Sequence, residues 1–255
     1  MFKIHPLFSG SSGNSTLVQC NGTNILVDAG RSATAICKAL SEYGLGLNDI
    51  DGILITHEHI DHTSSLENIS KKFKIPIHFA KPSYDEFVQK GSCLYDNAIS
   101  HDIEYSVEFN DVSVKSFKIP HDSVCNVGFT FVCEDDKFSY ATDIGHLTDE
   151  IYDNLCGSRV VVIESNHDID MLKNGPYPQY LKERIMSKKG HLSNDDCSKL
   201  SLYLAQNGTK EIILAHLSDK NNEPELAKAA VDKILNENGY HDIILTVAPK
   251  NSLER

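Results

Sequence analysis

The sequence lacks the features that mark secreted, membrane-spanning or metal-thiolate proteins. No uninterrupted apolar run in the 255 residues approaches the ~20 residues that a membrane span requires. The first residues, MFKIHPLFSGSSG, have neither a long apolar segment nor a small-residue cleavage site, so we expect no secretory signal. The seven cysteines are an odd number and form no C-x-x-C pair, which favours reduced, mostly buried thiols in a cytoplasmic protein.

Basic residues are also few. Lys and Arg number 24 against 36 Asp and Glu, and the formal net charge of −12 argues against broad non-specific affinity for nucleic acid. It does not exclude a nucleic-acid enzyme, because divalent ions would restore positive charge at a site and some basic residues are grouped. The group comprises Lys182, Arg184, Lys188 and Lys189. Its alternative interpretation is a solvated helix face.

Residues 57–62 hold four metal-ligating side chains within six positions, directly after the apolar run 52–56. In an extended chain His57 and His59 point the same way and can reach one ion. Asp61 and His62 lie beyond the bend and can reach a second ion. Imidazole and carboxylate together suit zinc, manganese or iron. The alternative is a polar strand-to-helix turn with Asp61 capping the next helix, but it leaves three clustered histidines unexplained.

Strand-like and helix-like segments alternate along the whole chain without a linker between them. The expected strands are 15–20, 23–28, 52–56, 75–80, 103–109, 112–119, 127–133, 137–142, 159–164, 211–215 and 242–247. The expected helices are 32–43, 62–73, 83–90, 180–188, 194–206 and 224–237. This pattern predicts a single α/β domain over residues 1–255, with two sheets packed face to face and covered by helices in a four-layer αββα sandwich.

Polar ligands recur at the ends of the apolar strands. They are Asp28, His121, Asp143, Glu164 and His216. A single Asp or His after a strand is usually a turn residue. Five of them, added to the H-x-H-x-D-H segment at one rim of a sheet sandwich, predict a metal site.

In this order the residues resemble the motif series of the metallo-β-lactamase superfamily of metallohydrolases, and the resemblance covers most of the chain. Shorter motifs are similar to those of the YycJ (WalJ) family of bacterial, cytoplasmic 5′→3′ DNA exonucleases. They are SGSSGNS (9–15), ATDIG (141–145), ESNHD (164–168), GPYP (175–178), GHLSN (190–194) and LAHLS (214–218).

The resemblance implies two divalent ions per chain, either Zn²⁺ or Mn²⁺, with Asp143 bridging them and Asp28 orienting ligands by hydrogen bonds. The ligands of the first ion would be His57, His59 and His121, and those of the second Asp61, His62 and His216. The catalytic residues would be Asp61, Glu164 and His191. The last two correspond to a pair that handles the leaving-group proton in ribonuclease Z-like enzymes, although Asn166 and His167 compete with Glu164 for this place.

The function that the resemblance implies is a dinuclear-metal phosphodiesterase, a 5′→3′ DNA exonuclease in which a hydroxide shared by the ions attacks phosphorus. Nucleic acid, specifically DNA, would be its partner, and no membrane partner is expected. Segment 9–15 either offers N–H groups to a phosphate or forms a simple turn. Two alternatives remain: a hydrolase of a cyclic phosphodiester, lactone or thioester, and a non-catalytic metal-binding regulatory protein.

Overall fold

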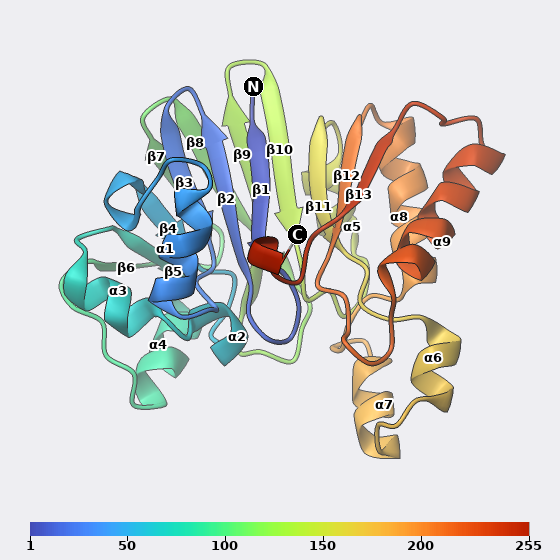
Figure 1. The fold of residues 1–255 in the computed structure, drawn as a ribbon, viewed down its shortest axis with the longest axis horizontal. Helices are drawn as coiled ribbons and strands as arrows, with labels where there is room; N and C mark the ends of the chain where they lie inside the picture. The colour runs from blue at the N-terminus through green and yellow to red at the C-terminus, as the bar shows by residue number, and fades with distance from the viewer. Residues whose placement is uncertain (255) are drawn as a thin grey trace.

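The strands form two sheets in the computed structural model, which describes residues 1–254 (Figure 1). The first sheet has six strands in the order β1-β2-β3-β4-β5-β6. Their bounds are β1 Lys3–Phe8, β2 Ser15–Cys20, β3 Thr23–Val27, β4 Gly52–Leu54, β5 Ile77–Ala80 and β6 Ala98–His101. Strands β1 to β3 pair antiparallel and β3 to β6 pair parallel.

The second sheet has seven strands in the order β13-β12-β11-β10-β9-β8-β7. Their bounds are β7 Ser106–Phe109, β8 Val112–Ile119, β9 Asn126–Cys133, β10 Asp136–Ala141, β11 Val160–Glu164, β12 Glu211–Ala215 and β13 Ile244–Val247. Strands β10 to β13 are parallel to one another, and β7 to β10 form antiparallel pairs.

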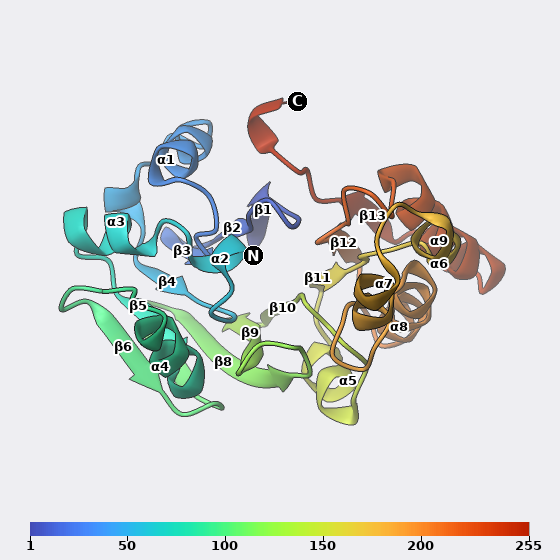
Figure 2. The ribbon, with the colours of Figure 1, turned by 90° about the horizontal axis from the view of Figure 1, so that it is seen from below.

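Helices cover the outer face of each sheet (Figures 1 and 2). Over the first sheet lie α1 Ala33–Ser41, α3 Leu66–Lys72 and α4 Lys81–Gln89, and over the second lie α5 Asp149–Leu155, α8 Asn194–Gln206 and α9 Pro224–Glu237. The short α2 Ile60–Thr63 lies at one edge of the sandwich, and α6 Ile169–Asn174 and α7 Gln179–Ile185 project from the same side. The predicted four-layer αββα arrangement is confirmed. No helix in the described part of the chain is long and apolar enough to cross a membrane.

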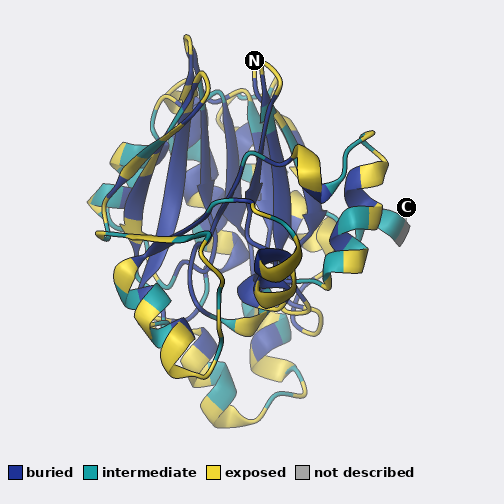
Figure 3. Ribbon diagram, turned by 90° about the vertical axis from the view of Figure 1, so that its left-hand side faces the viewer, coloured by how far each residue is buried: buried dark blue, intermediate teal, exposed yellow. Residues whose placement is uncertain are grey.

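The central strands are buried on both faces, which is why they read as continuous apolar runs. In β11, Val160 and Val162 pack between the sheets, whereas Val161 and Ile163 pack against the covering helices. The burial colouring in Figure 3 shows the strands as a buried interior and the helices as half-exposed shells. Side chains at the strand ends are therefore attached to a rigid frame.

Several expected elements differ from the observed ones. The helix expected at 62–73 is two helices, α2 and α3, because Ser65 leaves the helical path and bonds the carbonyl of Ala29 through both its amide and its hydroxyl. The strand expected at 103–109 is shorter and begins at Ser106. The strands β1 and β6 and the helices α5 and α6 were not expected, and neither were two 3-10 turns at Leu47–Asp49 and Ser252–Glu254.

Candidate metal centre

The site lies at one edge of the sandwich, where strands β3, β4, β8, β10, β11 and β12 all end (Figure 2 looks toward this edge from below). The carboxyl ends of strands running in one direction meet at one edge, so ligands distant in sequence converge there. The side chains that gather are His57, His59, Asp61, His62, His121, Asp143, Glu164, His191 and His216. The structure thus brings together the residues that the motifs singled out.

Three of the strand-end residues adopt the left-handed backbone conformation. Asp28 has φ 63°, Asp143 has φ 58° and His216 has φ 57°. Such values are uncommon for residues with side chains and cost about 1–3 kcal/mol at strained sites. The chain therefore turns sharply as it leaves β3, β10 and β12, and each turn carries a polar residue of the site.

The first histidine group consists of His57, His59 and His121, whose ring nitrogens lie close enough to share one ion. Nδ1 of His57 lies 3.0 Å from Oγ1 of Thr56, and Nδ1 of His121 lies 3.0 Å from the carbonyl oxygen of Gly190. A carbonyl oxygen only accepts hydrogen bonds, so Nδ1 of His121 donates and its Nε2 is left with a free lone pair. Burial lowers the pKa of both His57 and His121, which favours the neutral form that binds metals.

The second group consists of Asp61, His62 and His216. Oδ2 of Asp61 lies 3.4 Å from Nε2 of His62 and 3.7 Å from Nε2 of His216. Asp61 lies in the first turn of α2, whose N-cap is His59 and has no side-chain capping bond. The alternative that Asp61 merely caps a helix is therefore wrong.

Asp143 lies between the two groups. Its Oδ1 is 3.7 Å from Nε2 of His121, and its Oδ2 is 3.4 Å from Nε2 of His62. Oδ1 also lies 3.4 Å from Nδ1 of His216, so the carboxylate of Asp143 contacts histidines of both groups. This is the arrangement that a bridging ligand requires.

Several buried polar atoms at this site have no hydrogen-bond partner, and their positions show whether the site fits cations. Nε2 of His57, Oδ2 of Asp143 and Nε2 of His216 are buried, and none has a hydrogen-bond partner. Leaving a buried polar atom unsatisfied costs about 1–3 kcal/mol, so three together need an explanation. All three point into one cluster of nitrogen and oxygen donors, and divalent cations satisfy all of them at once.

The electrostatic balance of the second group also fits a cation. Burial lowers the pKa of His62, but the carboxylates of Asp28, Asp61 and Asp143 outweigh it and the net pKa is raised well above its ordinary value. Burial lowers the pKa of His216, but Asp143, Asp61 and Glu164 outweigh burial and raise the pKa to about 10. A field that holds protons this strongly attracts divalent cations for the same reason.

Asp28 is fully buried and orients His62 instead of facing the donor cluster. Its Oδ2 accepts a hydrogen bond from Nδ1 of His62 at 2.8 Å, and its Oδ1 accepts one from the amide of Thr56 at 2.9 Å. The bond fixes the tautomer of His62 and aims Nε2 at the site, as carboxylates behind metal-binding histidines commonly do.

Glu164 occupies a fully buried position and accepts four hydrogen bonds. Its Oε2 takes the amides of Ile144 and Leu192, and its Oε1 takes Nδ1 of His191 at 2.8 Å and Nδ1 of His216 at 2.9 Å. Burial raises its pKa, but the two histidines outweigh this and the net pKa is lowered, so the carboxylate is ionised. Glu164 is therefore placed to orient both an expected metal ligand and the expected proton donor. Its competitors for this place, Asn166 and His167, do not make these contacts.

Sequence reasoning missed Asn14. Its Nδ2 lies 3.3 Å from Oδ2 of Asp61 and 3.1 Å from Nε2 of His62, and its amide donates to the carbonyl of Asp61. Gly30 makes room for this contact, since a Cβ there would lie 1.6 Å from the carbonyl oxygen of Asp61. The glycine- and serine-rich segment before Asn14 was the available signal.

The glycine amides of segment 9–15 are not free to bind a phosphate. The amide of Gly10 donates to Oδ1 of Asn14, and the amide of Gly13 donates to the carbonyl of Gly10. Ser9 accepts the amide of His216. The loop supports the second ligand group.

Two cavities flank the donor cluster, and Arg184 lines both of them. One includes Asp122 and His191, and the other includes His59 and Asp61. Arg184 donates from Nε to Oδ2 of Asp122 at 2.5 Å. Of the other grouped basic residues, Lys188 and Lys189 are exposed, whereas Lys182 is half-buried and bonds the carbonyl of Lys173.

Comparison with known proteins shows the family and the fold. The family model described as "Metallo-beta-lactamase superfamily" matches residues 9–191. The chain is 34% identical to "Exodeoxyribonuclease YycJ" of Bacillus anthracis, over 92% of this chain and 89% of that protein. It is 35% identical to "Exodeoxyribonuclease WalJ" of Streptococcus pneumoniae, over 89% and 85%. Among solved structures, the metallo-β-lactamase fold protein YhfI of Bacillus subtilis superposes with a TM-score of 0.73 at 13% identity, over 98% and 97% of the two chains.

Proposed function

The chain belongs to the metallo-β-lactamase superfamily of metallohydrolases, and from this premise we propose that it is a two-metal phosphodiesterase that degrades DNA from the 5′ end. His57, His59 and His121 would hold one divalent ion, and Asp61, His62 and His216 the other. Asp143 would serve both. Neither Zn²⁺ nor Mn²⁺ is favoured over the other, because the donors are all imidazole or carboxylate.

The single observation that carries this proposal is the position of Asp143. Its carboxylate lies within 3.7 Å of His121 in the first group and within 3.4 Å of His62 and His216 in the second, and its Oδ2 is buried without a partner. When bound, a pair of divalent ions supplies charge neutralisation for a phosphate and activation of a water molecule. Asp143 would be the carboxylate that both ions share.

His191 is the residue that this chain offers as proton donor to the leaving oxygen. Burial lowers its pKa, but the charge and hydrogen bond of Glu164 outweigh burial and the net pKa is raised. Its Nδ1 is committed to Glu164, so Nε2 is the atom that would deliver the proton. About a fifth of its side chain is exposed, at 21%, so a substrate can reach it.

DNA as the substrate is supported by the two relatives named exodeoxyribonuclease, each similar over most of its length. The grip on the strand would come from Arg184, Lys188 and Lys189 beside the site. Their positive charge opposes the net charge of −12 of the whole chain.

The test is digestion of 5′- and 3′-end-labelled DNA and RNA by the purified protein with added Mn²⁺ or Zn²⁺, beside a His59→Ala control. The expected result is stepwise release of mononucleotides from the 5′ end of DNA, lost in the control. If no nucleic acid is cut with either metal while a small phosphodiester or lactone is hydrolysed well, the substrate assignment is wrong and the small-molecule alternative replaces it.

A further inference from the structure

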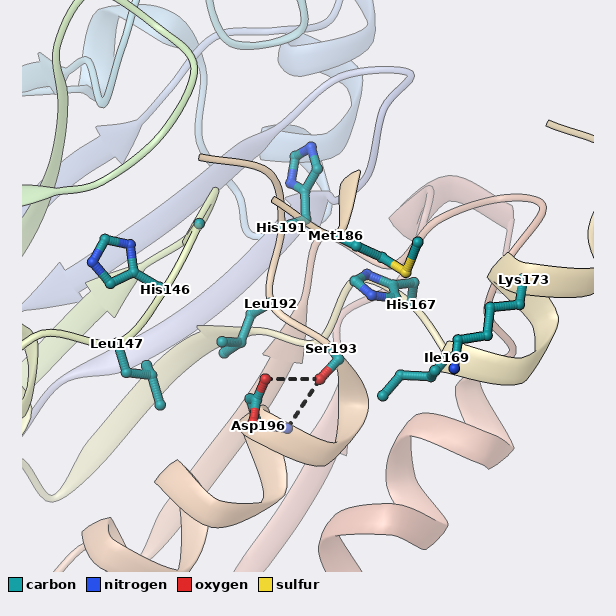
Figure 4. A pocket seen from close by; sticks show the side chains of 11 residues that line it. His146, Leu147, His167, Ile169, Lys173, Met186, His191, Leu192, Ser193 and Asp196 are labelled. Carbon is teal, nitrogen blue, oxygen red and sulfur yellow. Dashed lines mark hydrogen bonds between the residues drawn. The ribbon is translucent and has the colours of Figure 1, made fainter. Parts of the chain in front are cut away.

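A separate cavity of about 480 Å³ lies beside His191 (Figure 4). Ile169 and Lys173 of α6 line one side, and His146 and Leu147 line the other. Met186 also lines it, and the start of α8 lies below. The volume lies within the ~300–1,000 Å³ range of small-molecule sites. None of the expected metal ligands lines this cavity.

His191 connects the cavity to the metal centre, because it lines the cavity while its Nδ1 lies 3.6 Å from Oδ1 of Asp143. A general acid must lie within hydrogen-bond reach of the oxygen that it protonates. The group that departs from phosphorus therefore has to lie on the same side as His191. Two cavities include His191: this one, and the Arg184-lined cavity that also includes Asp122.

His167 provides an independent sign of a ligand. Its side chain is 3% exposed, it lines the cavity, and its Nδ1 is buried with no hydrogen-bond partner. Figure 4 shows its ring between Met186 and Ile169. Neither the metal centre nor the fold uses this nitrogen, so a polar group of a bound molecule is the partner that it lacks.

The lining combines apolar side chains with Lys173 and Asp196, so it suits a nucleoside, which has both apolar and polar surface. Burial lowers the pKa of His167 to about 4, so it is uncharged near neutral pH. The carboxylate of Asp196 is paired with Lys199 and accepts the hydroxyl of Ser193. Leu147, Ile169 and Met186 offer apolar surface to a base.

We propose that this cavity is the leaving-group subsite, which holds the 5′-terminal nucleoside of the strand during cleavage. The inference rests on the function proposed above and deepens it, because a cavity of this size accommodates one nucleoside and so limits each cut to the end of the strand. In the step, the oxygen of water joins phosphorus and the bond from phosphorus to O3′ of the terminal nucleotide breaks. The electron pair stays on O3′, which takes a proton from His191, and the proton released by water restores the balance.

The test compares tryptophan substitutions at two similarly exposed apolar residues. Met186→Trp fills the cavity from a position that is 43% exposed, and Leu226→Trp on the distant helix α9 changes a residue that is 40% exposed. A third variant, His167→Phe, keeps a ring of similar size and removes both nitrogens. Each metal-loaded protein is assayed on 5′-labelled DNA and on bis(p-nitrophenyl) phosphate. The second assay is repeated with thymidine, which has no phosphate, and with inorganic phosphate as inhibitors.

For Met186→Trp we expect the ratio of the DNA rate to the bis(p-nitrophenyl) phosphate rate to fall about tenfold or more, because a filled pocket excludes the nucleoside. Thymidine inhibition should weaken about tenfold in Met186→Trp and about fivefold in His167→Phe, with phosphate inhibition changed less than about twofold. Leu226→Trp should behave as wild type.

Equal DNA rates and equal thymidine inhibition in the three variants and the wild type would overturn the subsite while leaving the exonuclease proposal intact. Absence of thymidine inhibition in the wild type would overturn it as well. A wild type that hydrolyses bis(p-nitrophenyl) phosphate but no DNA would overturn the proposed function, and the subsite with it.

Discussion

Nδ1 of His62 donates a hydrogen bond to Oδ2 of Asp28 over 2.8 Å, and both side chains are completely buried. The two residues are 34 positions apart: Asp28 directly follows β3, and His62 lies in helix α2. The bond directs Nε2 of His62 toward Asp61 and Asp143, where the second ion is expected. Asp28 therefore acts on the metal centre through His62, whereas Asp143 is expected to bind the metals directly. Substituting each residue should distinguish these two roles.

Asp143→Asn should abolish hydrolysis, whereas Asp28→Asn should lower it by ~10–100-fold, because a carboxylate behind a ligand tunes the metal but does not bind it. Asparagine suits both positions since it tolerates the left-handed conformation that each residue adopts. Steady-state rates and elemental analysis of both variants check this. Equal and small losses would show that Asp143 is not the bridge.

His191→Ala should slow DNA cleavage by ~10²–10⁴-fold and leave metal content intact, since the residue donates a proton and holds no ion. The loss should shrink for bis(p-nitrophenyl) phosphate, whose nitrophenolate leaves without a proton. Rates on both substrates and metal content are the measurements. A fall in metal content together with activity would make His191 a ligand.

Glu164→Gln should lower the rate of hydrolysis of both DNA and bis(p-nitrophenyl) phosphate, in contrast to His191→Ala. Oε1 of Glu164 accepts from His216 as well as His191, so the amide disturbs an expected metal ligand together with the proton donor. Each lost charge-assisted hydrogen bond is worth roughly 1.5–3 kcal/mol. We expect weaker metal retention on dialysis and a lower rate on bis(p-nitrophenyl) phosphate. If that rate and the metal content match wild type, Glu164 acts through His191 alone.

Reversing charge at Lys188 and Lys189 should weaken DNA cleavage and flatten its salt dependence. Each phosphate contact contributes a slope of roughly −0.9 in log affinity against log salt on duplex DNA, so losing two contacts flattens the slope by about 2. Lys228→Glu with Lys233→Glu is the matched control, with the same charge change on exposed positions of α9. The measurement is the dependence of KM for DNA on salt concentration in the wild type and in both double variants. If the two double variants have the same slope, the DNA strand follows another path and these lysines are simply solvated residues of the turn after α7.

The stacked pair His78 and His101 should make the fold less stable in acid. Their nitrogens lie 2.9 Å apart, and burial followed by repulsion from His101 lowers the pKa of His78 to about 4. The unfolded chain takes up this proton near pH 6.5, so stability is full above that pH and declines as the pH falls toward 4. The decline amounts to roughly 2 kcal/mol between pH 6.5 and 5.

Urea unfolding of wild type and His78→Phe at pH 7.5 and pH 5 measures this effect apart from the metal centre, which both proteins share. The gap between the two pH values should be smaller in the variant. An unchanged gap would mean that His78 does not titrate across this range.

The sequence predicted the fold wherever apolar runs were long enough to be buried on both faces. Helices α8 and α9 and strand β12 begin and end at the expected residues. Strand β1 was missed because Pro6 interrupts it, and a proline in a strand is tolerated at a sheet edge such as β1 occupies. Strand β6 was missed because two of its four residues, Ile99 and Ser100, are exposed, so it has no apolar run.

The site was predictable to the extent that its residues follow strands. Four site residues could be recognised because each is a polar residue after an apolar run: Asp28, His121, Asp143 and His216. Asn14 follows no strand, and the glycine- and serine-rich segment before it indicates a turn but not the contact with Asp61, which is 47 residues away. The second bond of Glu164, to His216, likewise arises from two strands that pair side by side, β11 and β12.

The most direct test of the central claim is anomalous diffraction from crystals of the protein grown with saturating Mn²⁺ or Zn²⁺. We expect two peaks per chain, one coordinated by His57, His59 and His121 and the other by Asp61, His62 and His216. Both peaks should lie within bonding distance of Asp143. A single peak at saturating metal, with His216 pointing away from it, would contradict the two-metal centre.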